Sequence, residues 1–257
     1  MTMDKGKPIS FDGRAPFQGP GAAELEAQHR EVLRRYVDLL AGCVAVRLTG
    51  TRDPEELYAL HVRDCLTSVP LLPPPAPQGE APRRVVDVGS GGGLPGLVWA
   101  VCRPDVEVVL LDSVGKKCRA VEDIAGTLGV SNVEVVHGRS EDLARARREG
   151  FDLACARAVA SAGVTAELLS PLTRVGGTLL TFKGPKLPGE LAETKGRWGR
   201  LGLRAPLVLS CGEAGDNRMP DGDEGSSRCL ALWEKAAPCP RTYPRRPGMA
   251  SMKGWWL

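Results

Sequence analysis

The glycine-rich segment from Asp87 to Gly96 is the feature that most constrains the fold of this chain. It reads D-V-G-S-G-G-G-L-P-G and directly follows an apolar run at residues 84–88. A strand that ends in glycines and leads into a helix is typical of the first turn of a doubly wound α/β sheet, where the backbone approaches a ligand closely. The segment therefore predicts a ligand-binding loop, with a tight turn that binds nothing as the alternative.

Apolar runs with strand-like composition alternate with helix-like stretches through most of the chain. There are seven of them, at residues 84–88, 106–111, 133–137, 153–156, 177–183, 207–211 and 230–235. Continuous apolar strands separated by helices are typical of a largely parallel sheet that is covered on both faces. We expect an α/β, Rossmann-like fold with seven mostly parallel strands. The acidic, glycine-rich stretch at 212–227 is expected to be a loop between the last two strands.

Composition breaks divide the chain into five parts. Residues 1–22, rich in Gly, Pro and polar groups, are expected to be disordered, and residues 23–69 to form a small N-terminal helical extension. Within it, helical periodicity runs over 22–45, and a second helix should begin at Asp53-Pro54 and run to about residue 69. A proline-rich linker at 70–82 then marks a boundary before the main domain, 83–237, and a basic tail, 238–257.

Several classes of protein are excluded by composition. A hydrophobic share of 42% and a charged share of 25% are ordinary for globular domains. No apolar run approaches the roughly 18 residues of a membrane span, and Asp4 and Asp12 occupy the region where a signal peptide is hydrophobic. Eight scattered cysteines without a C-x-x-C pair, and only three histidines, predict no metal site. We expect a cytoplasmic protein, with a monomer favoured.

The acid that opens the glycine loop distinguishes between two cofactors. The pattern D-x-G-x-G-x-G fits Asp87, Gly89, Gly91 and Gly93. A carboxylate beside a diphosphate is unfavourable, whereas S-adenosylmethionine (SAM) carries an ammonium and a sulfonium and no phosphate. Asp112 ends the next strand, where either cofactor would offer it two ribose hydroxyls. A SAM-dependent methyltransferase is therefore favoured, and a NAD-type oxidoreductase is the alternative.

The third and fourth strands supply further candidates. Ser140 and Glu141 follow the third strand, where they flank an adenine ring or else form a helix N-cap. Arg157 ends the fourth strand and can position the cofactor or the target base; a salt-bridged core arginine is the alternative. This strand lacks the D/N-P-P-Y motif, which would indicate methylation of an exocyclic amine. The Pro238-Cys239 pair could suggest a cysteine nucleophile for pyrimidine C5 methylation, but it lies in the basic tail and is interpreted as a coincidence. The methyl acceptor that remains is a ring nitrogen, which can attack the methyl group without first losing a proton. In-line transfer then depends on the alignment of the reacting atoms.

The tail at 238–257 has basic residues and no acidic ones. They are Arg241, Arg245, Arg246 and Lys253, and among them stand Tyr243, Trp255 and Trp256. Cations neutralise phosphates and aromatic faces stack on unpaired bases, so we expect this tail to contact RNA. Its removal should weaken RNA binding and leave the affinity for SAM nearly unchanged. A solvated extension is the alternative for the tail, and a non-catalytic RNA-binding factor that retains SAM is a further alternative for the whole chain.

The motifs together resemble the RsmG (GidB) family of 16S ribosomal RNA guanine-N7 methyltransferases from about residue 31 to 248. The matching pieces are Leu48-Thr49 with Arg52-Asp53-Pro54, the stretch 61–64 (HVRD), 86–96, 110–117, 157–161, Lys183-Gly184 and 243–248 (YPRRPG). The sequence departs from the family pattern at Arg47, where asparagine is usual, and at Cys65, where serine is expected.

The resemblance implies a function and a set of residues. The substrate would be N7 of a guanine in the 530 loop of 16S-type ribosomal RNA, free or within the small ribosomal subunit, methylated without a general base. The implied cofactor-binding residues are Gly89, Leu94, Ser140, Glu141 and Arg157. His61 and Asp64 lie three apart and share one helix face that is expected to meet the active site, an ordinary surface pair being the alternative. Lys183 joins the tail arginines as an expected RNA contact.

Overall fold

A computed structural model describes residues 20–210 and 228–257 of the 257-residue chain. The expectation of disorder at 1–22 lies almost wholly outside these residues, and the loop expected at 212–227 lies entirely outside them.

One sheet organises the described residues. Its seven strands are β1 (Arg83–Val88), β2 (Val106–Asp112), β3 (Val133–His137), β4 (Phe151–Arg157), β5 (Thr173–Lys183), β6 (Leu207–Ser210) and β7 (Cys229–Glu234). Their order in space is β3-β2-β1-β4-β5-β7-β6. Strands β1 to β5 pair in parallel, and β7 runs antiparallel to both β5 and β6. This is the Rossmann-like class I methyltransferase topology, and it confirms the predicted fold class.

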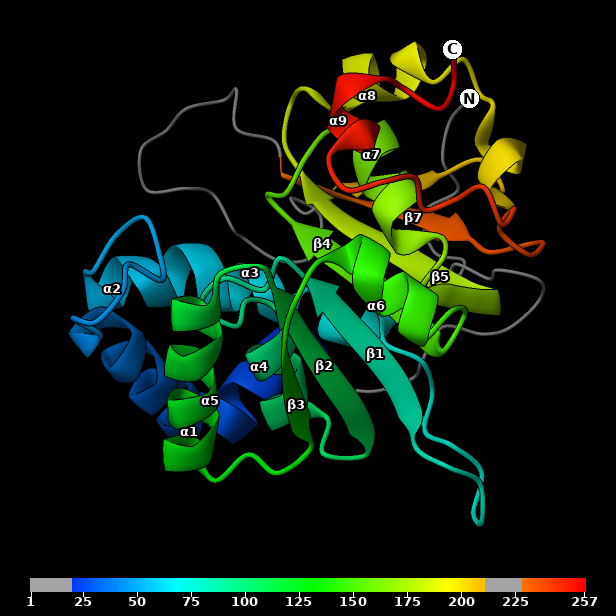
Figure 1. The fold of residues 1–257 in the computed structure, drawn as a ribbon. Helices are drawn as coiled ribbons and strands as arrows, with labels where there is room; N and C mark the ends of the chain where they lie inside the picture. The colour runs from blue at the N-terminus through cyan, green and yellow to red at the C-terminus, as the bar shows by residue number, and fades with distance from the viewer. Residues whose placement is uncertain (1–19, 211–227) are drawn as a thin grey trace.

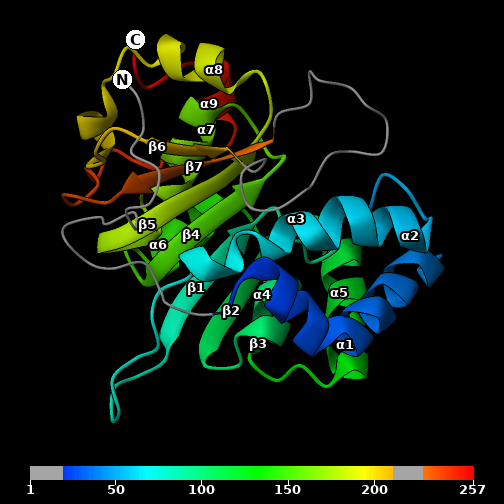
Figure 2. The same ribbon diagram turned by 180° about the vertical axis from the view of Figure 1, so that it is seen from behind.

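Helices cover both faces of the sheet, as the apolar strands predicted. They are α1 (Ala22–Gly42), α2 (Pro54–Leu57), α3 (Arg63–Leu66), α4 (Gly96–Cys102), α5 (Gly115–Leu128), α6 (Ser140–Ala146), α7 (Ala162–Leu169), α8 (Leu187–Glu193) and α9 (Met249–Met252), with short 3₁₀ turns at Val69–Leu71 and Trp198–Leu201. Helices α1 to α5 lie over one face and α6 to α9 over the other (Figures 1 and 2). Each face has its own hydrophobic cluster.

The second N-terminal helix differs from its prediction. It begins as expected, with Asp53 Oδ1 accepting from the backbone N–H of Glu55 at 2.8 Å and Pro54 in the first turn. Between α2 and α3, however, the segment Tyr58–Val62 is a π-helix. A widened turn of this kind rotates the following residues relative to a regular helix and occurs often at functional sites. His61 lies in this turn.

The N-terminal helices share a core with the sheet. The hydroxyl of Tyr36, fully buried on α1, donates to the carbonyl of Gly92 in the glycine loop at 2.8 Å. Trp99 Nε1 on α4 donates to Ser68 Oγ at 2.8 Å. Both contacts join residues before the proline-rich segment 70–82 to residues after it, so that segment connects two parts of one packed structure.

The C-terminal segment, residues 238–257, is packed against the second face of the sheet. Arg148 donates to the carbonyls of Cys239 at 2.6 Å and Tyr243 at 2.8 Å. Trp255 is only 4% exposed, and its Nε1 donates to the carbonyl of Gly163 on α7 at 2.7 Å. The alternative of a solvated extension is therefore wrong. Trp255 also cannot offer a face to an RNA base, because its ring is enclosed by protein.

No helix in the described residues is long and apolar enough to cross a membrane. The same residues hold no group of three or more His, Cys, Asp or Glu side chains placed to bind a metal ion.

Candidate active site

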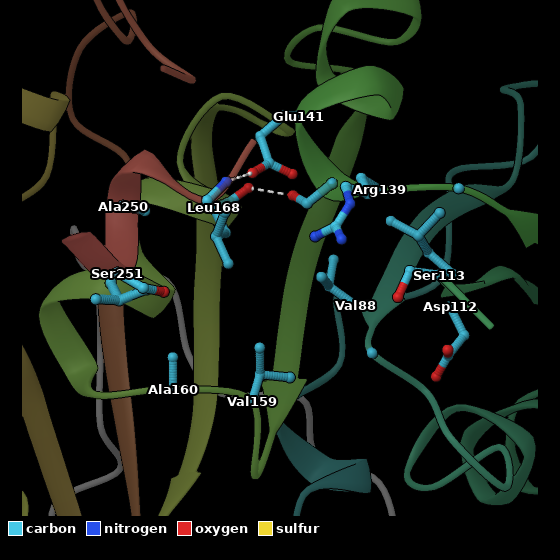
Figure 3. A pocket seen from close by; sticks show the side chains of 16 residues that line it. Val88, Asp112, Ser113, Arg139, Glu141, Val159, Ala160, Leu168, Ala250 and Ser251 are labelled. Carbon is cyan, nitrogen blue, oxygen red and sulfur yellow. Dashed lines mark hydrogen bonds between the residues drawn. The ribbon is translucent and has the colours of Figure 1, made fainter. Parts of the chain in front are cut away.

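A cavity of about 210 Å³ lies at the carboxyl ends of β1, β2 and β4, beside the start of α6. Its lining residues are Val88, Gly89, Leu111, Asp112, Ser113, Gly138, Arg139, Ser140, Glu141, Val159, Ala160, Val164, Leu168, Gly248, Ala250 and Ser251. In Figure 3, Ala250 and Ser251 stand on one side, Asp112 and Ser113 on the other, and Glu141 at the top. Ligands of open α/β sheets bind at this edge.

At Gly89 the glycine loop lines the cavity with backbone atoms and no side chain. This residue has φ +74°, in the left-handed region, and an added Cβ would lie 2.7 Å from Val159 Cγ2. Its N–H donates to the carbonyl of Leu111 at 2.7 Å, which fixes the loop to β2. Of the other predicted loop residues, Gly91, Gly93 and Leu94 are not among those described as lining the cavity. Leu94 is instead 8% exposed and packed in the core.

Asp112 lies in the cavity wall, as predicted. Its Oδ2 accepts from the N–H of Gly91 at 2.9 Å, and its Oδ1 accepts from the N–H of Val114 at 2.9 Å. A carboxylate has about four acceptor positions. These two bonds therefore hold the side chain in place and leave acceptor capacity for ligand hydroxyls.

Asp87 lies beneath the loop and not in the cavity wall. It is fully buried, and its Oδ2 accepts from the N–H of Gly96 at 3.0 Å. Its Oδ1 has no hydrogen-bond partner among the described residues. Burial raises the pKa of this carboxyl to about 7, although the Gly96 hydrogen bond and the positive charge of Arg157 oppose the rise. A cationic ligand above the loop would favour the ionised form.

Ser140 and Glu141 open α6 and both line the cavity. The hydroxyl of Ser140 donates to the carbonyl of Leu168 at 2.7 Å, and the helix N-cap is Arg139, with no capping side-chain hydrogen bond. The alternative that Ser140 is a helix cap is therefore wrong. Glu141 is 6% exposed, and its Oε1 accepts from the N–H of Gly248 at 3.4 Å.

Arg157 joins the end of β4 to the N-terminal helices. Its Nη2 lies 3.1 Å from Asp64 Oδ2 and 2.9 Å from His61 Nδ1. The sequence predicts that His61 and Asp64 share one helix face that meets the active site, and in the structure both side chains contact Arg157. The alternative of an ordinary surface pair is wrong, since the Asp64 side chain is only 8% exposed. None of these three side chains is part of the cavity wall. The ion pair of Arg157 agrees with the alternative of a salt-bridged core arginine, and its contact with the cofactor stays a prediction.

His61 is held in its neutral form. Burial, together with the positive charges of Arg157 and Arg228, lowers its pKa to about 4. Since Arg157 donates to Nδ1, the remaining proton of the neutral ring sits on Nε2. The basic nitrogen of His61 is therefore occupied.

Asp64 has a second partner that sequence reasoning missed. Arg228 Nη1 lies 3.2 Å from Asp64 Oδ2 and donates to the carbonyl of Leu60 at 2.6 Å. Burial raises the pKa of Asp64, and the two arginines oppose that rise. No motif marks Arg228; it stands directly before β7, and only the fold brings it to Asp64.

The predicted RNA contacts differ in exposure. Arg241 and Arg246 are exposed. Lys183 is 8% exposed, lies 2.9 Å from Glu190 and donates to the carbonyl of Ala160. Arg245 forms a two-bond ion pair with Glu167, at 2.7 and 2.5 Å. Lys183 and Arg245 are therefore bound within the protein.

The cavity has the features that SAM requires. The apolar side chains of Val88, Leu111, Val164 and Leu168 provide surface for a flat ring, and Asp112 provides acceptors for hydroxyls. Beneath the loop, the partnerless Asp87 Oδ1 adds a carboxylate that a cation would compensate. The residues present fit this cofactor.

Comparisons with known proteins agree with the geometry. The model of the family described as "GidB: rRNA small subunit methyltransferase G" matches residues 29–219. A protein named ribosomal RNA small subunit methyltransferase G from Symbiobacterium thermophilum is 36% identical over 238 residues, or 90% of this chain and 89% of the relative. Its namesake from Rubrobacter xylanophilus is 39% identical over 227 residues, or 86% and 82%. Among solved structures, a 16S rRNA (adenine(1408)-N(1))-methyltransferase from Catenulisporales acidiphilia has a TM-score of 0.48 and 16% identity, covering 63% of this chain and 91% of its own.

The fold and its cavity define a class I methyltransferase with SAM as cofactor. The chain belongs to the rRNA small subunit methyltransferase G family. The alternative of a NAD-type oxidoreductase is wrong, and the topology agrees, because β7 is inserted antiparallel between β5 and β6 where the dinucleotide fold has a parallel order. Membership in a family of methyltransferases favours catalysis over the alternative of a non-catalytic factor.

Proposed function

We propose that this protein transfers the methyl group of SAM to N7 of a guanine in the 530 loop of 16S-type ribosomal RNA, in the cytoplasm. Family membership supports ribosomal RNA of the small subunit as the substrate. The observation that carries the proposal is the cavity at the carboxyl ends of β1 and β2, with Gly89 and Asp112 in its wall.

The side chains beside the site suit an acceptor atom that carries no proton and therefore needs no base. Guanine N7 attacks through a lone pair, so the positive charge passes from the sulfonium to the purine ring and no base is required. His61 is neutral with its Nδ1 bound by Arg157, and Asp64 is paired with two arginines. Neither group is free to remove a proton, which supports transfer by alignment alone.

Arg157 is the residue that we assign to positioning. It is held by Asp64 on one side and lies 5.6 Å over the ring of Phe182 on the other, so its guanidinium has one fixed orientation. It stands at the end of β4, two residues before Val159 of the cavity wall. Its fixed side chain anchors the start of the loop that carries Val159 and Ala160 of the cavity wall.

The test is mass mapping of 16S rRNA after incubation with the full-length protein and SAM. Naked RNA and whole small subunits, both from cells that lack the modification, form two arms. We expect one added methyl on a 530-loop guanine, with the reduction and aniline cleavage that mark N7-methylguanine. Methylation of another base, or none in either arm, would refute the proposed specificity.

A further inference from the structure

The C-terminal segment, residues 238–257, forms one wall of the cofactor cavity. Gly248, Ala250 and Ser251 line the cavity together with Ser140 and Glu141. Figure 3 shows Ala250 and Ser251 on one side of the cavity. The sequence predicts that this segment contacts RNA and that its removal leaves the affinity for SAM nearly unchanged. A wall made of its residues argues against the second prediction, because a ligand in the cavity would lie against this segment.

Two contacts join the C-terminal segment to the helices on either side of the cavity, and a third joins these two helices to each other. Glu141 on α6 accepts from the N–H of Gly248. Ser140, also on α6, donates to Leu168 on α7. Glu167, the neighbour of Leu168 on α7, binds Arg245, which lies three residues before Gly248. The contacts form a closed ring from α6 to α7 to the C-terminal segment and back to α6.

The Arg245–Glu167 pair is the strongest contact in this ring. It is bidentate, with Nε to Oε1 at 2.7 Å and Nη2 to Oε2 at 2.5 Å, and the Glu167 side chain is 1% exposed. Arg245 also donates to the carbonyl of Lys253 at 2.6 Å, on the far side of α9. The guanidinium of Arg245 thus joins the two ends of residues 245–253 to each other and to α7. Because the guanidinium is planar and binds Glu167 through two parallel bonds, it also fixes the orientation of this segment.

The Glu141–Gly248 bond is weak by comparison, at 3.4 Å. Gly248 has φ +84°, which lets the chain turn sharply into α9 at the cavity. A long bond at a turn cannot hold the wall by itself. Trp255 fixes the chain after the wall through its bond to Gly163, and the ion pair of Arg245 fixes the chain before it.

We propose that Arg245 and Glu167 are positioning residues of the cofactor site, whose ion pair holds residues 248–251 as the wall against which SAM binds. This assignment replaces the expectation that Arg245 contacts RNA. It rests on the proposed methyltransferase function only in the choice of SAM as ligand.

The test measures SAM and S-adenosylhomocysteine binding by calorimetry on the full-length protein without RNA. The double variant Arg245→Gln with Glu167→Gln removes the pair without leaving a buried charge and keeps the net charge. We expect both ligands to bind at least about tenfold more weakly. In turnover, KM for SAM should rise by a similar factor, while kcat and KM for RNA stay within twofold of wild type.

The control is the double variant Arg145→Gln with Asp142→Asn, which removes an exposed ion pair on α6 with the same change of charge. It should bind SAM as the wild type does. Gly248→Ala is a second variant that should disturb the wall. Nothing lies within 4 Å of the added Cβ, but the positive φ of this residue disfavours alanine. It should also weaken SAM binding.

Other outcomes would overturn the proposal. If the first double variant lowers Tm but binds SAM within twofold of wild type, the ion pair serves folding alone. If it loses RNA affinity at unchanged SAM affinity, the segment is an RNA-binding arm. Wild-type protein that binds SAM but methylates no RNA would refute the proposed function without touching this inference.

Discussion

The guanidinium of Arg157 lies 3.1 Å from the carboxylate of Asp64, and this buried ion pair joins the end of β4 to helix α3. The two residues are 93 positions apart in the chain by their numbers, 157 − 64. The pair therefore couples the N-terminal helices to the strand that ends at the cavity.

Replacing Asp64 with asparagine should cost both stability and activity. It leaves Arg157 and Arg228 without their carboxylate, and breaking a buried pair in this way costs about 3 kcal/mol. Tm should fall by about 6–12 °C for a chain of this size. Because Arg157 loses its orientation, kcat/KM should fall by about 100-fold. Thermal unfolding and methyl-transfer assays measure the two effects.

The control for Asp64→Asn is Asp142→Asn, which breaks an exposed pair with Arg145. It should change the free energy of unfolding by about 0.5 kcal/mol or less. If the two variants unfold at the same temperature, the Arg157–Asp64 pair does not hold the two parts together.

His61 should titrate near pH 4 in the folded protein, because burial lowers its pKa. In the unfolded chain the ring takes up a proton below about pH 6.5. The contribution of this group to stability is therefore present above pH 6.5 and is lost as pH falls toward 4. NMR of the imidazole signals gives the midpoint, and urea unfolding between pH 4 and 7 gives the slope.

His61→Gln should remove this part of the acid sensitivity, and His137→Gln, at an exposed histidine, should retain it. If His61 were a general base, the rate of methyl transfer would show an inflection near pH 4 in the wild type that is absent in His61→Gln, and we expect no such inflection. Such an inflection would make His61 a general base and contradict transfer by alignment alone.

Local pattern predicted the sheet and the residues at the ends of its strands. Asp112, Ser140 and Glu141 were found because the carboxyl end of a parallel strand faces the ligand wherever the strand sits in the sheet. Gly248 was not found as a wall residue, since its contact with Glu141 spans 107 residues and depends on how α6, α7 and the C-terminal segment pack. A run of basic and aromatic residues looks the same in a packed segment as in a free one.

Asp87 should make stability fall as pH rises. Its folded pKa is about 7 and its unfolded pKa about 3.8, so the folded protein keeps a proton that the unfolded chain releases. This stabilisation is fully present below about pH 4 and is lost as pH rises to about 7, by on the order of 4 kcal/mol. Urea unfolding should show Asp87→Asn free of this loss, with the exposed Asp123→Asn as control.

The same carboxyl gives SAM binding a pH dependence. A cationic ligand favours ionised Asp87, so the affinity for SAM should rise between pH 6 and 8 in the wild type and not in Asp87→Asn. Calorimetry at several pH values measures it. An affinity for SAM that is flat with pH in the wild type would show that the buried carboxyl does not sense the ligand.

Gly89→Ala should weaken SAM binding at least tenfold. The backbone at φ +74° costs an alanine about 1–2 kcal/mol, and the new methyl would lie 2.7 Å from Val159 Cγ2 in the cavity wall. Adding Val159→Ala relieves the clash but not the backbone strain, so it should restore part of the affinity. Gly126→Ala on α5 meets nothing within 4 Å and should leave binding unchanged. Wild-type affinity in Gly89→Ala would mean that the cofactor site tolerates a displaced glycine loop, and so that the cofactor does not contact the backbone of Gly89.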